Sequence, residues 1–89
     1  MKINENFLLR EVAGNRVVMP VGEAAERFNG MIKLNGSGAY LFEKIQTGIE
    51  TEDDLVAAML ADYDVDEETA RRDIGNFVTT LRKIGIIED

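Results

Sequence analysis

Three groups of residues in this sequence have the types and spacing that bind phosphate or metal ions. In the first group, Gly36 and Gly38 follow a strand-like segment and precede a helix-like one, as in many phosphate-binding loops. A dinucleotide-binding loop needs a third glycine where Leu41 stands, and a Walker loop needs a lysine directly after its last glycine. We therefore interpret residues 35–38 as a tight turn that caps the following helix.

The second group consists of carboxylates at the spacing of a calcium-binding loop. Asp62, Asp64 and Asp66 occupy the first, third and fifth positions of such a loop, and Asp73 occupies the twelfth. However, Glu67 stands at the sixth position, where the sharp turn needs glycine, and the twelfth position favours the longer glutamate. A solvated acidic turn that caps the next helix is the better interpretation, because carboxylates are stabilised near the positive end of a helix dipole.

The third group is made of the cations Arg71, Arg72, Arg82 and Lys83 on one predicted helix. Such a helix could read DNA in a winged-helix protein, so a DNA-binding regulator is the alternative function. The ten acidic residues between positions 50 and 73 would repel nucleic acid phosphates. A solvated helix face or a site for an acidic peptide fits these cations better.

Composition excludes many function classes. The 89 residues include no cysteine and no histidine, which removes disulfides, thiolate metal sites and the commonest general base. The dense carboxylates have no apolar pocket residues between them, so we predict no active site, no metal site and no cofactor. The net charge of −7 argues against nucleic acid and membrane surfaces as partners. No apolar segment reaches the ~20 residues that span a bilayer, so we expect a cytoplasmic protein.

The N-terminal part of the chain predicts three strands. Residues 7–12 and 16–21 form two apolar, β-branched runs around a turn at residues 13–15, which indicates a β-hairpin that should end near Pro20. A polar connector leads to a third strand over residues 30–34. Alternation along that strand places Ile32 and Leu34 on one face, and Met31 and Lys33 on the other.

The C-terminal part predicts three helices. They start near Asn35 or Ser37, at Thr51, and at Asp64 or Asp66, and the last ends at Gly85. Residues 86 and 87 should fold back against the body. One domain over residues 1–89 is therefore expected, of the α+β class, with a three-stranded antiparallel sheet followed by three helices. Such an open sheet has exposed edges, and a homodimer through one of them is compatible with the sequence.

Nearly the whole chain resembles the PqqD family, named for protein D of pyrroloquinoline quinone biosynthesis. A tryptophan that is common in the family near Phe42 is absent here. The resemblance is carried by four motifs: Leu34-Asn35-x-x-Gly38-Ala39, Thr51-x-x-Asp54-Leu55, Tyr63-Asp64-Val65-Asp66 and Asp73-Ile74-x-x-Phe77-x-x-x-Leu81.

The resemblance implies a winged-helix-like domain of the kind called a RiPP recognition element, where RiPP stands for ribosomally synthesised and post-translationally modified peptide. Such an element binds the precursor peptides before they are modified. Such domains hold the leader segment of the precursor and present its core to a partner enzyme, commonly a radical S-adenosylmethionine maturase. The leader adds as a further strand to the edge of the third strand, in a groove that the third helix completes. This binding mode needs no catalytic residue. The resemblance does not make pyrroloquinoline quinone the product.

The implied peptide-binding residues lie on the third strand and the third helix. On the strand they are Met31, Ile32, Lys33 and Leu34. On the helix, one flank presents Arg71, Gly75 and Arg82, and the other presents Thr69, Asp73, Asn76 and Thr80.

Both flanks could meet the peptide, and we favour the side of Arg71 and Gly75, with Arg72 nearby. Arginine suits an acidic leader, and glycine permits close approach. The alternative for Gly75 is a plain helix defect that costs about 1 kcal/mol relative to alanine.

Overall fold

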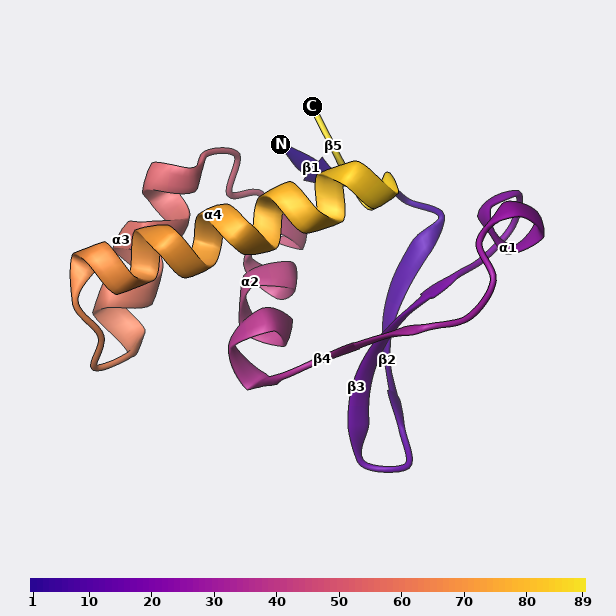
Figure 1. Cartoon of the computed structure of the whole chain (residues 1–89), viewed down its shortest axis with the longest axis horizontal. Helices are drawn as coiled ribbons and strands as arrows, with labels where there is room; N and C mark the ends of the chain where they lie inside the picture. The colour runs from indigo at the N-terminus through magenta and orange to yellow at the C-terminus, as the bar shows by residue number, and fades with distance from the viewer.

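Five strands and four helices make up the computed structural model, which describes residues 1–89 (Figure 1). One antiparallel sheet has the order β2-β3-β4, and a second, two-stranded sheet pairs β1 with β5. The strands are β1 (Lys2–Ile3), β2 (Phe7–Val12), β3 (Asn15–Pro20), β4 (Ile32–Leu34) and β5 (Ile87–Glu88). The helices are α1 (Ala24–Arg27), α2 (Gly36–Gln46), α3 (Glu52–Asp62) and α4 (Glu67–Ile84).

The α+β class, the three-stranded antiparallel sheet and the three long helices are confirmed. Two features were not predicted, namely α1 and the pairing of β1 with β5. The sequence also placed the start of the third strand too early, because β4 begins at Ile32 and Met31 lies outside it. Helix α1 has only four residues and no side-chain cap, so it leaves little signal in the sequence.

A two-residue turn joins β2 and β3. Ala13 and Gly14 both have positive φ, 52° and 82°, which is the backbone of a type I′ turn. Asn15 is already the first residue of β3, although the sequence placed it in the turn. Pro20 ends β3 as predicted, opposite Phe7.

Side-chain caps fix the start of each long helix. Asn35, Thr51 and Asp66 each accept a hydrogen bond from the backbone N–H three residues later, at 2.7–3.1 Å. At the other end of α4, Gly85 has φ 92°, the left-handed conformation that stops a helix. These caps decide the two choices that the sequence left open, for Asn35 over Ser37 and for Asp66 over Asp64.

The core lies where the helices meet the sheet. Figure 1 shows α2, α3 and α4 gathered on one side of the molecule and the β2–β3 hairpin with α1 on the other; β4 runs between them. One stripe of α4 is buried against this core, and it consists of Ala70, Ile74, Val78 and Leu81. None of the helices is long and apolar enough to cross a membrane.

The two ends of the chain lie side by side, because β1 pairs with β5 in register Ile3 to Ile87 (Figure 1). The backbone N–H of Asn4 donates to the carbonyl of Ile86 at 2.7 Å. Ile86 and Ile87 are at most 2% exposed, so the predicted folding back of these residues is confirmed.

Candidate functional site

β4 is an edge strand, since β3 pairs with one of its sides and no strand pairs with the other. In a two-residue hairpin the residues that flank the turn, Val12 and Asn15, exchange both backbone hydrogen bonds, and bonded pairs then alternate along the ladder. Odd-numbered residues of β3 therefore point their backbone groups toward β2. Beyond the strand, the N–H of Val21 continues this alternation by donating to the carbonyl of Asn6 at 2.8 Å.

The same alternation shows which backbone groups of β4 remain open. The even-numbered residues of β3 point toward β4, where they pair in register with Ile32 and Leu34. The N–H and C=O of Lys33, the residue between them, consequently point to the unpaired edge. An added strand could bond to Lys33 without displacing any bond of the existing sheet.

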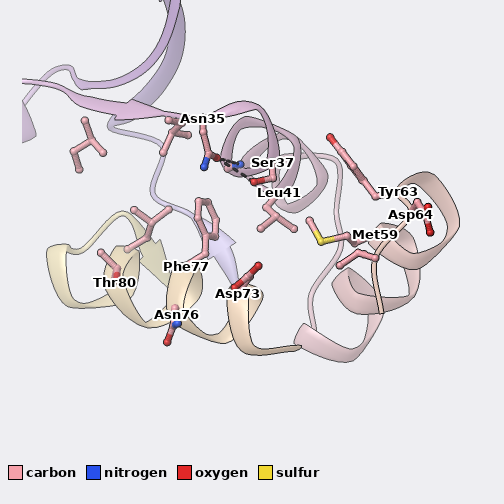
Figure 2. Close-up of a pocket in the computed structure, with 15 residues that line it drawn as sticks. Asn35, Ser37, Leu41, Met59, Tyr63, Asp64, Asp73, Asn76, Phe77 and Thr80 are labelled. Atoms are coloured by element: carbon pink, nitrogen blue, oxygen red, sulfur yellow. Dashed lines mark hydrogen bonds between the residues drawn. The ribbon is translucent and has the colours of Figure 1, made fainter. Parts of the chain in front are cut away.

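A groove of about 610 Å³ runs along this edge, between β4 and α4 (Figure 2). Its apolar part comes from Ile32 and Leu34 on β4, and from residues of α2, α3, α4 and the loop between the last two. Those further apolar residues are Leu41, Met59, Val65, Phe77 and Leu81. Ile32 and Leu34 are half-buried, in keeping with the predicted alternation along the strand.

The polar part of the groove carries negative charge. Asp73, Asn76 and Thr80 project from α4 on the groove side, and Figure 2 shows Asp73 between Phe77 and the α3 end of the groove. The residues that line the groove include Asp64 and Asp73 but no lysine or arginine. Of the two flanks that the sequence left open, the structure therefore places the Asp73 flank beside β4.

The flank that we preferred from the sequence lies outside this groove. The guanidinium of Arg71 donates to Asp53 on α3 at 2.7 Å and to Glu67 at 2.9 Å, and these bonds raise the pKa of Arg71. The nearest atom to a Cβ built on Gly75 belongs to Glu52, also on α3. Arg71 and Gly75 thus face the start of α3, because α4 packs against α3 along this flank.

The predicted site residues accordingly do not come together as one surface. Ile32 and Leu34 line the groove, whereas Lys33 and Met31 are exposed and lie outside its lining. Arg72 lies outside the groove lining, and its Nε is 3.6 Å from Asp73 Oδ1.

Several groove residues were not predicted, and they come from elements distant in sequence. Leu41, Met59 and Tyr63 reach the groove only because α2 lies beside β4 and α3 packs against α4. Phe77 could have been found, since it lies four residues after Asp73 on the same helix flank. Asn35 and Ser37 line the groove through the turn that caps α2.

The carboxylates of the calcium-like spacing have other roles. Asp66 accepts hydrogen bonds from the backbone N–H and the hydroxyl of Thr69, and these bonds lower the pKa of Asp66. Asp62 accepts a hydrogen bond from the hydroxyl of Tyr40 at 2.6 Å, and burial and this bond raise the pKa of Tyr40. No three carboxylates come together in a way that could hold a metal ion.

Two solved structures share this fold over almost its full length. TbiB1 in complex with the TbiA(beta) leader peptide has a TM-score of 0.79 and 22% identity, and the match covers 99% of this chain and 95% of that one. Lasso peptide synthetase B1 complexed with the leader peptide has a TM-score of 0.77 and 19% identity, with 99% and 96% covered. At such low identity the likeness shows a common fold.

The fold and the groove define a small α+β domain with an open strand edge beside a helix. No match to the chain is found among curated proteins. The family model for coenzyme PQQ synthesis protein D (PqqD) matches residues 8–87, and the chain therefore belongs to the PqqD family.

Proposed function

We propose that this chain is an adaptor that binds the leader segment of a ribosomally made precursor peptide. Residues 1–89 form one recognition domain, which works in the cytoplasm and presents the core of the precursor to a modifying enzyme, such as a radical S-adenosylmethionine maturase. The observation that carries this proposal is the open backbone of Lys33 directly beside the apolar groove.

Strand addition explains how such a site could be both strong and selective. The N–H and C=O of Lys33 offer one donor and one acceptor to a peptide strand, which supplies affinity from main-chain hydrogen bonds. Every second side chain of that peptide would enter the groove over Leu34 and Phe77, which supplies specificity. The sheet would grow from three strands to four, and the open backbone groups of β4 would be paired.

The role proposed is binding rather than catalysis. The chain has no cysteine and no histidine, and the carboxylates that line the groove are exposed. The two solved structures of the same fold were both determined with a leader peptide. Their association with leader peptides supports the same occupant here, and no cofactor is needed for it.

The test compares Lys33→Pro with Lys33→Ala. A proline at this position removes the open donor but no bond of the β3–β4 ladder, so the domain should stay folded. We expect Lys33→Pro to weaken binding of the leader about tenfold or more, because one main-chain hydrogen bond is lost and the ring obstructs pairing. Lys33→Ala should change the affinity much less.

The measurement is calorimetric titration with the synthetic leader of a precursor encoded beside this gene. Circular dichroism of both variants verifies that they remain folded. Equal affinity losses in the two variants would count against strand addition. Failure of any neighbouring leader to bind would overturn the adaptor function, and steeply salt-dependent DNA binding would favour the regulator instead.

A further inference from the structure

We infer that the groove selects leaders with a lysine or arginine among their apolar residues, and that this cation binds in the part of the groove that Asp73, Asp64 and Tyr63 line. We call these three residues the acidic end of the groove. The inference rests on the proposed function, since it concerns the peptide that occupies the same groove. It reverses the charge that the arginines of the sequence suggested for the leader.

The carboxylates of the acidic end have acceptor capacity left. The side chain of Asp73 is 58% exposed, and its closest cation is Arg72, at 3.6 Å, a distance too long for a hydrogen bond. Asp64 is exposed and forms no ion pair within the chain. A strand laid on β4 would cover this end of the groove and partly exclude water, which strengthens an ion pair formed there.

An aromatic ring completes the acidic end. Tyr63 is 42% exposed, and its ring packs edge to face on Tyr40, with the ring centroids 5.0 Å apart. The hydroxyl of Tyr40 is in turn held by Asp62. Figure 2 shows Tyr63 and Asp64 together beyond Met59. Carboxylates beside an exposed aromatic ring are a typical environment for a lysine or arginine side chain.

The net charge of the molecule also favours a basic leader over an acidic one. The net charge is −7, and residues 50–73 contribute ten acidic side chains against two basic ones. Of those two cations, Arg71 is already bonded to Asp53 and Glu67. An acidic leader would therefore approach against the field of the protein, whereas a basic one would be attracted to it.

The inference is tested by selection, because the natural leader is unidentified. A display library of random short peptides is selected on the full chain and, in parallel, on Lys33→Pro. Peptides lost on Lys33→Pro are those that pair with the β4 edge. We expect these edge-dependent peptides to be enriched in lysine or arginine together with apolar residues, and depleted in aspartate and glutamate.

Point variants then distinguish a direct contact between the peptide and Asp73 from the effect of the protein's overall charge. For a selected basic peptide, Asp73→Asn should weaken binding about three- to tenfold, as for a partly covered ion pair. Glu68→Gln makes the same change in net charge on α4 outside the groove lining, and should weaken binding by less than about twofold. Arg72→Gln should strengthen binding, because it removes the cation that competes for Asp73.

The outcomes distinguish the two proposals. Edge-dependent peptides that are neutral or acidic, or that bind Asp73→Asn as tightly as the original chain, would overturn the charge preference and leave the adaptor function standing. A weaker affinity in Arg72→Gln would favour the acidic leader instead. If no selected peptide depends on the β4 edge, the adaptor function fails and the inference fails with it.

Discussion

Ala13 is the only non-glycine residue with positive φ, 52°, and it occupies the first central position of the hairpin turn. Alanine is disfavoured in this backbone conformation because of its Cβ. Asparagine tolerates the conformation better, since its short polar side chain can form local hydrogen bonds, and it is preferred in type I′ turns. The β2–β3 hairpin therefore holds a small amount of strain at a solvent-exposed residue.

Ala13→Asn should raise the free energy of unfolding by about 0.5–1 kcal/mol, because the turn backbone then suits its residue. Urea denaturation at constant pH measures this difference. Gly14→Ala is the matched control, and should destabilise the domain, since φ at that position is 82°. A lower stability of Ala13→Asn would show that the turn has another conformation in solution.

Asp66 gives the domain a defined response to acid. Bonds from the backbone N–H and hydroxyl of Thr69 lower the pKa of this carboxyl in the folded state. A lowered pKa contributes stability that is fully present above the unfolded pKa and is lost as the pH falls through the folded one.

Asp66→Asn keeps the helix cap but does not titrate, so it should lose less stability than the original chain between about pH 5 and pH 2. Thermal unfolding across this range measures the difference. Parallel losses in the two proteins would mean that Asp66 has the same pKa folded and unfolded.

At the scale of the elements, local patterns predicted the three long helices and limited the N-cap of each one to one or two residues. Asn35, Thr51 and Asp66 cap the helices through neighbours three residues away, so the local sequence already limits the candidates to a few residues. The side on which α4 meets β4 depends instead on how α4 packs against α3. The periodicity of α4 does not show which of its flanks faces β4. We therefore preferred the flank of Arg71 for its chemistry, whereas the groove lies on the other flank.

A substitution at Gly75 tests which flank of α4 contacts the leader. A Cβ at this position would find only Glu52 Oε1, at 3.8 Å, so alanine fits. Gly75→Ala should stabilise α4 by about 0.5–1 kcal/mol, the usual gain of alanine over glycine within a helix.

Leader affinity should remain unchanged in Gly75→Ala, because this residue faces α3 and not the groove. Urea denaturation and calorimetry measure the two quantities. A large loss of affinity would restore the flank that the sequence favoured. Gly38→Ala is the comparison within the groove, since its Cβ would come 3.1 Å from Asn35 Oδ1 and 3.5 Å from Phe77 Cε1.

At the scale of the whole molecule, the C-terminal residues complete the core. Ile86 is fully buried although it follows the last helix, and it accepts a hydrogen bond from Asn4 near the other end of the chain. The sequence predicted that these residues fold back, because two adjacent isoleucines are seldom left in water. It could not predict β1 as their partner, since a two-residue strand has no pattern of its own.

Ile86→Ala should lower the free energy of unfolding by about 2–4 kcal/mol, through lost burial and a cavity. Ile84→Ala removes the same atoms from a residue that is 37% exposed, and should cost less than about 1 kcal/mol. Ile86→Val, with an expected cost of about 1 kcal/mol, keeps the comparison measurable if the alanine variant does not fold. Equal effects at positions 84 and 86 would contradict this packing.

The pairing of β1 with β5 also sets an order of events during synthesis. Lys2 and Ile3 leave the ribosome early, but their partners Glu88 and Ile87 are made more than eighty residues later. The hairpin and the β4 edge can form from neighbours made at nearly the same time. During synthesis there is therefore an interval in which β2, β3 and β4 have all been made while the first strand still lacks its partner.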